Sequence, residues 1–78
     1  MKIEIRLIGR LTEYWESGKL LDIADGATIS ESLEAIGLPD GEAGMVSVNG
    51  ASIPRKNRES QKLAEGDSIT IMAPVHGG

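Results

Sequence analysis

The residues of this sequence best suited to take part in a reaction are the last two, Gly77 and Gly78, which would end the chain in a free α-carboxylate. A free α-carboxyl group has a pKa of about 3.5, so it is an anion at neutral pH. Glycine has no Cβ and adopts backbone angles closed to other residues, so a Gly-Gly end suits a narrow channel. Most termini are simply loose. The sequence therefore leaves two interpretations: a frayed end, or a carboxylate that is the working part of the protein.

Few other side chains are suited to chemistry. The chain of 78 residues has no cysteine, which excludes disulfides, thiolate metal sites and cysteine nucleophiles. The single histidine, His76, cannot form a histidine cluster, and we interpret it as an exposed residue that contacts a partner rather than as a catalytic group. The glutamates show no metal-ligand spacing, and no Gly-rich phosphate loop is present. We therefore expect no bound metal or cofactor.

Charge and hydropathy exclude two further classes. The net charge of −4 argues against a nucleic-acid binder, because phosphate contacts need a basic surface. The one basic cluster, residues 55–58, is interpreted as a solvated loop. No apolar stretch approaches the ~20 residues that span a bilayer, and the start of the chain lacks the apolar region of a signal peptide. We expect one cytoplasmic domain over residues 1–78, monomeric on its own.

Alternation of apolar and polar residues predicts the strands that would carry the terminus. Residues 2–8 alternate cleanly, with Ile3, Ile5 and Leu7 on one face. Two turn signals support the pattern, since Asn49-Gly50 favours a tight hairpin and Asp67 is suited to cap the turn before the last strand. The further predicted strands are residues 19–24, 45–48, 51–53 and 68–72.

One amphipathic helix is predicted over residues 28–36. Thr28 and Glu31 have the spacing of a capping box. Gly37 follows where a left-handed residue ends a helix. The apolar stripe of this helix consists of Ile29, Leu33 and Ile36.

The predicted elements follow the order β-β-α-β-β-β, so a single helix covers one face of a small mixed sheet. The other face is then expected to be largely solvated. Among the connections, Leu63 is predicted to fill the core. Tyr14-Trp15 is interpreted as the anchor of the loop after the first strand rather than as a ligand platform.

Several ordered motifs resemble the MoaD/ThiS family of ubiquitin-like sulfur carriers. They are Asp25-Gly26-Ala27-Thr28 at the helix start, Val48-Asn49-Gly50 at the hairpin, Leu63 to Asp67 before the last strand, and the ending Ala73-Pro74-Val75-His76-Gly77-Gly78. The ending is similar to the "PPVxGG" tail of molybdopterin synthase small subunits. The resemblance implies an α+β fold of the ubiquitin-like β-grasp type, with four to five strands on one main helix and a flexible tail over residues 73–78.

The resemblance also implies a chemical cycle at the terminus. An ATP-dependent adenylyltransferase of the MoeB/ThiF type would adenylate the Gly78 carboxylate, and a sulfur donor would convert it to a thiocarboxylate. A second partner, such as a large molybdopterin synthase subunit of the MoaE type, would use that sulfur. Gly77 would help Gly78 to enter the partner's active site. This chain would bind no cofactor, since the ATP belongs to the partner.

Such a carrier needs a docking surface. In a β-grasp sheet the first and last strands are parallel neighbours, and the third strand runs antiparallel to the last. Alternation then places Ile8, Met45 and Met72 together on the outer face, at the end where the tail emerges. We predict that they form an apolar contact patch for partners. The tail residues expected to join this contact are Pro74, Val75 and His76.

Other roles stay open at this stage. Sulfur transfer in thiamine thiazole synthesis, cysteine synthesis or tRNA thiolation uses the same kind of terminus, because the fold does not set the acceptor. A ubiquitin-like modifier would join Gly78 to lysines on target proteins. A plain interaction module would have no use for the two glycines.

Overall fold

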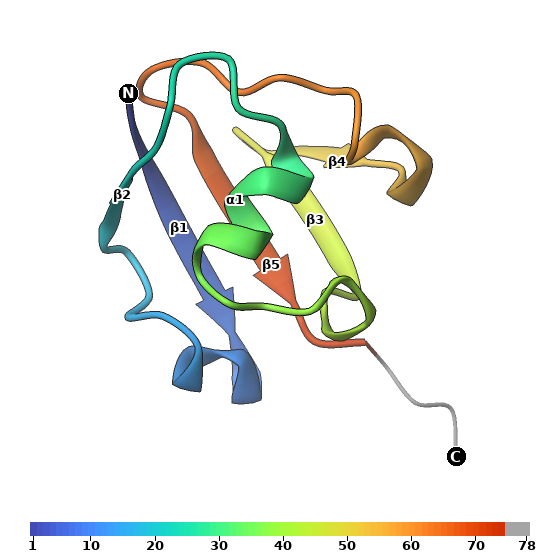
Figure 1. Ribbon diagram of the computed structural model, residues 1–78. Coiled ribbons are helices and arrows are strands. Elements are labelled where there is room, and N and C mark those ends of the chain that lie inside the picture. Colours follow the sequence, from blue (N-terminus) through green and yellow to red (C-terminus); the bar gives the residue numbers. More distant parts are fainter. Residues whose placement is uncertain (75–78) are drawn as a thin grey trace.

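The computed structural model describes residues 1–74 and shows one mixed sheet of five strands crossed on one face by a helix (Figure 1). The strands lie in the order β2-β1-β5-β3-β4. Strands β1 and β5 are parallel, and every other neighbouring pair is antiparallel. This is the predicted ubiquitin-like β-grasp fold. The elements are β1 (Lys2–Ile8), β2 (Leu20–Asp22), α1 (Ile29–Ala35), β3 (Met45–Val48), β4 (Ala51–Ile53) and β5 (Ser68–Met72).

The core lies between α1 and the inner face of the sheet, and it is almost wholly aliphatic. Alternation along β1 buries every second side chain, as the period of two predicts. Leu63, which precedes β5, is also buried, as predicted. The largest contributions come from Ile3, Ile5, Leu7, Leu11, Ile29, Leu33, Val46, Ile69 and Ile71.

Local signals set both ends of α1 as the sequence predicts. The Thr28 hydroxyl accepts a hydrogen bond from the Glu31 N–H, and the Glu31 carboxylate accepts one from the Thr28 N–H. At the other end Gly37 has a φ of 75°, and the Leu38 N–H donates to the Leu33 carbonyl. Leu38 folds back into the core, which completes a Schellman ending.

The hairpin and the turn before β5 are also confirmed. Asn49 and Gly50 both have positive φ angles, 50° and 86°, as a type I′ hairpin requires. The Asp67 carboxylate accepts a hydrogen bond from the Ala64 N–H, and its other oxygen accepts one from the Asn49 side chain. Asp67 therefore ties the turn to the hairpin.

One predicted strand is shorter in the structure. Strand β2 covers Leu20–Asp22 rather than residues 19–24, and past Asp22 the Ile23 backbone still exchanges two hydrogen bonds with Met1. In the connection after β1, Gly9–Glu13 forms a 3-10 helix that buries Leu11. No helix within residues 1–74 is long and apolar enough to cross a membrane.

Candidate functional site

The described chain ends at Pro74, two residues after β5, and this exit from the sheet is the centre of the candidate site. Val75, His76, Gly77 and Gly78 lie outside the described residues, so their predicted roles are not tested by the geometry. Ala73 and Pro74 are both partly buried. The first two residues of the predicted tail are thus attached to the body of the domain.

Three large apolar side chains lie exposed beside this exit. Met72 pairs with Ile8 on one side and with Met45 on the other, as the β-grasp register predicts. The exposed fractions are 46% for Ile8, 58% for Met45 and 40% for Met72. Large side chains at neighbouring, same-facing positions of three adjacent strands form one surface. We call these three residues the exit patch; their placement is confirmed, and their contact with a partner stays a prediction.

The rest of the outer face of the sheet is mostly polar. On β1, the Glu4 carboxylate accepts hydrogen bonds from the Ser68 hydroxyl at 2.8 Å and from the Arg6 guanidinium at 2.9 Å. These bonds, the Ser68 bond first, lower the pKa of Glu4. Leu20 on the edge strand β2 is the exception, since it is 55% exposed, and the sequence analysis did not single it out. It pairs with Glu4, four residues along β1 from Ile8.

Gly44 supports the chain from the other side of the exit. Its N–H donates to the Met72 carbonyl at 2.8 Å. A Cβ at position 44 would lie 2.5 Å from the Pro74 Cα, so the two backbones approach more closely than any other residue would allow. No sequence pattern marks this contact.

The basic cluster at residues 55–58 corrects a prediction. The sequence predicts a solvated loop here, but Arg58 is only 2% exposed and its guanidinium lies inside the domain. Arg58 donates to the Asp40 carboxylate at 3.0 Å and to the Gly44 carbonyl at 3.1 Å. A buried charge needs such partners, and they come from a loop that the sequence does not show to be near. Arg55 and Lys56 are exposed, as predicted.

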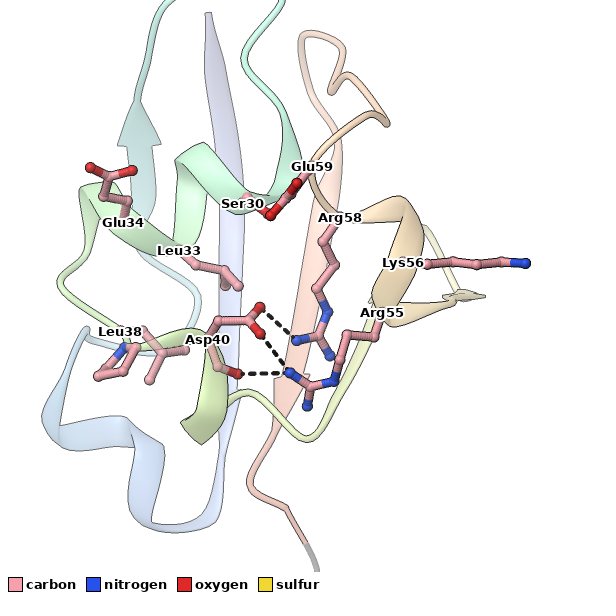
Figure 2. Close-up of a pocket in the computed structure, with 10 residues that line it drawn as sticks. Ser30, Leu33, Glu34, Leu38, Asp40, Arg55, Lys56, Arg58 and Glu59 are labelled. Carbon is pink, nitrogen blue, oxygen red and sulfur yellow. Dashed lines mark hydrogen bonds and ion pairs between the residues drawn. The ribbon is translucent and has the colours of Figure 1, made fainter.

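These arginines line a surface pocket of about 650 Å³ between α1 and the segment after β4 (Figure 2). Both guanidiniums point toward Asp40. Acidic and basic side chains are equally represented in its lining, which gives no preference for an anion or a cation. Within residues 1–74 no group of three or more His, Asp or Glu side chains is placed to hold a metal ion. The charged lining residues are Glu34, Asp40, Arg55, Lys56, Arg58 and Glu59.

Tyr14 and Trp15 anchor the loop after β1, as interpreted from the sequence. Both pack against the core and are partly buried. The Trp15 indole N–H donates to the Lys19 carbonyl at 3.1 Å, and the Lys19 ammonium lies 4.7 Å from the centre of the same ring. The rings therefore hold the path from β1 into β2.

Solved structures share this fold at low sequence identity. The small archaeal modifier SAMP1 from Haloferax volcanii is 23% identical, with both chains fully covered and a TM-score of 0.71. The thiamine biosynthesis protein ThiS from Geobacter metallireducens is 20% identical, also with both chains fully covered and a TM-score of 0.71. A complex of subunits 1 and 2 of molybdopterin-converting factor from Helicobacter pylori contains a chain that is 22% identical, with full coverage of both and a TM-score of 0.63. At these identities the likeness establishes the fold.

No curated protein matches the sequence. The sequence model of the ThiS family, in contrast, matches residues 5–78, which is nearly the whole chain and includes both final glycines. This match agrees with the β-grasp sheet and with the fold shared with ThiS and with molybdopterin-converting factor. The chain belongs to the ThiS family of ubiquitin-like sulfur carriers.

Proposed function

We propose that this chain carries sulfur for molybdopterin synthesis, in the molybdenum or tungsten cofactor pathway, as a thiocarboxylate on Gly78. The observation that carries the proposal is the family match, because it extends through Gly77-Gly78 rather than stopping at the end of the sheet. The exit patch supports it, since an exposed apolar surface lies where the chain leaves the sheet toward these glycines.

The reaction requires that the Gly78 carboxylate enter the active site of a partner enzyme. A carboxylate anion is a poor electrophile, so an adenylyltransferase of the MoeB/ThiF type must first activate it. One carboxylate oxygen of Gly78 attacks the α-phosphorus of ATP, and pyrophosphate leaves. A sulfide anion then attacks the acyl carbon and AMP leaves, which gives the thiocarboxylate directly. If the donor is a persulfide, an acyl disulfide forms first, and a thiol must reduce its S–S bond to release the thiocarboxylate. The partner provides the catalytic groups, and this chain provides the acyl carbon.

The exit patch and the tail then have different roles in binding. Ile8, Met45 and Met72 dock on the partner, and the following residues lead the terminus into its active site. Methionine side chains are flexible and adapt to surfaces of different shape, which suits a carrier that meets an activating enzyme and later an acceptor. The tail residues in this contact are Pro74, Val75 and His76.

Two observations bear on the choice of pathway. The ending Ala73 to Gly78 is similar to the tail of molybdopterin synthase small subunits, and the Helicobacter pylori structure with this fold is a complex of the two molybdopterin-converting factor subunits. We therefore propose a large subunit of the MoaE type as the acceptor. Sulfur transfer in thiamine synthesis is the second candidate, because ThiS from Geobacter metallireducens shares the fold over the full chain.

The test is the mass of the protein after incubation with ATP, an adenylyltransferase from the same organism and a sulfur source. We expect the mass difference between oxygen and sulfur, located on Gly78 by fragmentation. A chain that lacks Gly77-Gly78 serves as the control and should stay unmodified. An unchanged wild-type mass, while a known carrier is converted in its own system, would contradict the proposal.

A second experiment separates the pathways. The thiocarboxylate form is mixed with the large molybdopterin synthase subunit and the pterin precursor, or with thiazole synthase and its substrates. Sulfur transfer to the pterin supports the molybdopterin assignment, and transfer to the thiazole alone replaces it. Conjugates with lysines of other proteins in a cell extract would instead identify a modifier, the role that the name of SAMP1 describes.

A further inference from the structure

Gly44 contacts the chain where it leaves β5, at Met72 and Pro74. The Gly44 N–H holds the Met72 carbonyl at the end of β5, and the Gly44 Cα faces the backbone of Pro74 without a side chain between them. Any movement of Gly44 therefore moves Pro74, because the two backbones are in direct contact. Pro74 in turn has a restricted φ and passes its direction to the residues that follow.

Gly44 is itself held from the far side of the domain. Arg58 donates one hydrogen bond to the Gly44 carbonyl and another to Asp40, which begins the same short segment. Arg55 donates to the Asp40 side chain at 2.6 Å and to the Ala43 carbonyl at 3.1 Å. Two guanidiniums thus fix both ends of residues 40–44. A planar guanidinium with several donors suits this task better than a lysine ammonium.

The backbone of Arg58 also contacts the start of the helix α1. The Arg58 carbonyl accepts a hydrogen bond from the Ser30 N–H at the start of α1. The Arg58 side chain is buried, whereas Arg55 and Asp40 are both exposed. The ion pair between Arg55 and Asp40 therefore stabilises this segment little on its own. Figure 2 shows the two arginine side chains converging on Asp40 from the segment after β4. Arg58 is therefore the central member, and it connects the tail exit to the rigid core.

We propose that Arg58 is a positioning residue, which acts through Asp40 and Gly44 to set the direction in which the chain leaves β5. We call Asp40, Gly44, Arg55 and Arg58 the exit clamp. The inference rests on the proposed function, in which the terminal carboxylate must reach the α-phosphorus of ATP in a partner. A misplacement of about 1 Å far from the reacting atoms can cost roughly 100-fold in rate. The clamp would thus affect the chemical step more than docking.

Gly44→Ala displaces the exit directly, and the chain offers a matched control. A Cβ at Gly44 would collide with the Pro74 backbone, whereas a Cβ at Gly41 would meet nothing within 4 Å. Neither position has a positive φ, so alanine is not strained by its own backbone at either. The two variants carry the same substitution in the same segment, and they differ in what the added methyl group meets.

The assay is pyrophosphate release by the adenylyltransferase that activates the wild-type chain, at varied carrier concentration. We expect Gly44→Ala to lower kcat roughly 10- to 100-fold and to leave KM within about threefold, and Gly41→Ala to match the wild type. A Gly44→Ala variant with the kcat of Gly41→Ala would overturn the inference. So would a raised KM at unchanged kcat, because Gly44 would then belong to the docking surface.

Arg58→Met tests the clamp without a partner protein. Methionine fills much of the buried space. It removes the Arg58 donor from the Gly44 carbonyl, and it leaves Asp40 bound to Arg55 alone. Hydrogen exchange then reports local opening. We expect the Gly44 amide to lose roughly tenfold in protection, while amides of β1 and β5 keep theirs. Arg58→Lys, which restores a cation beside Asp40, should recover part of the protection and part of the kcat.

The other results decide against the inference. A uniform loss of protection in Arg58→Met would mean that Arg58 only stabilises the fold, and unchanged protection at Gly44 would mean that the clamp does not hold the exit. If the wild-type chain is never adenylated, the proposed function fails and this inference fails with it. If the wild type is adenylated and Gly44→Ala equals Gly41→Ala, only the inference fails.

Discussion

The two faces of the sheet use the same strands for different purposes, and β5 shows the contrast in neighbouring residues. Ile71 faces α1 and is fully buried, while Met72 faces outward beside Ile8 and Met45. The inner face is apolar along its whole length because it excludes water together with the helix. The outer face is polar around Glu4, apart from Leu20 on the edge strand β2, and its cluster of apolar side chains lies at the tail exit.

This difference shows which apolar residues the fold requires. Burial of an aliphatic side chain stabilises a domain by roughly 1.5–3 kcal/mol, whereas a half-exposed side chain gives much less. The inner face therefore accounts for the stability of the sheet. The exit patch contributes little to folding, and a cluster of exposed apolar side chains on a small domain points to a contact with another molecule.

The largest expected effect comes from comparing Ile71→Ala with Met72→Ala. We expect Ile71→Ala to lower the free energy of unfolding by about 2–5 kcal/mol, because it leaves a cavity in the core. Met72→Ala should cost less than about 1 kcal/mol. Urea denaturation followed by circular dichroism measures both. Equal losses would show that the exit patch is part of the core and would remove the contrast between the faces.

Met72→Asp tests the outer face for partner binding. A charge at the centre of an apolar contact loses its water without gaining a partner, so we expect the Kd for the adenylyltransferase to rise at least ~10-fold. Isothermal titration calorimetry measures the change, and an unaltered far-ultraviolet spectrum shows that the fold is retained.

Two controls sharpen this result. Ser52→Asp places the same charge on the exposed strand β4, and Leu20→Ser removes an exposed apolar side chain from β2. Both should bind like the wild type. If Leu20→Ser weakens binding as much as Met72→Asp, the contact covers the whole outer face rather than the exit patch alone.

The sheet, its register and the exit patch could be predicted because each depends on a local pattern. The alternation in β1 and β5 gave the two faces, and Asn49-Gly50 gave the hairpin between β3 and β4. Once the β-grasp order was assumed, the position of Met72 between Ile8 and Met45 followed from counting residues. Capping and turn residues act within four or five positions, so a sequence shows them directly.

The exit clamp could not be predicted, because it depends on contacts between irregular segments. Arg58 follows a 3-10 helix with no periodic pattern, and its partner Gly44 is 14 residues earlier in the sequence. A cluster of basic residues is usually solvated, and the partners of this arginine in residues 40–44 come near it only in the folded chain. The Gly44 contact with Pro74 joins two segments 30 residues apart. Nothing in the composition of either segment indicates that they meet.

The smallest expected effect is the pH dependence of the polar end of the outer face. The Ser68 hydroxyl and then the Arg6 guanidinium hold the pKa of Glu4 below its ordinary value. A lowered folded-state pKa stabilises the domain above the ordinary glutamate pKa. That stabilisation is lost as the pH falls through the folded-state value. Glu4 should therefore contribute most at neutral pH and nothing in strong acid, and the effect is small because the group is near solvent.

The measurement compares the wild type with Glu4→Gln by urea denaturation between neutral and acidic pH. Every other carboxylate titrates in both proteins, so the difference in unfolding midpoint isolates Glu4. We expect the wild type to be slightly more stable at neutral pH and the advantage to disappear on acidification. The comparison is then repeated in a Ser68→Ala background, which lacks the larger cause of the pKa shift. There Glu4→Gln should change the unfolding midpoint by less. If the stability advantage of the wild type grows as the pH falls, the protonated form of Glu4 stabilises the domain more than the ionised form does. The outer face would then have no ionised, hydrogen-bonded end to contrast with the exit patch.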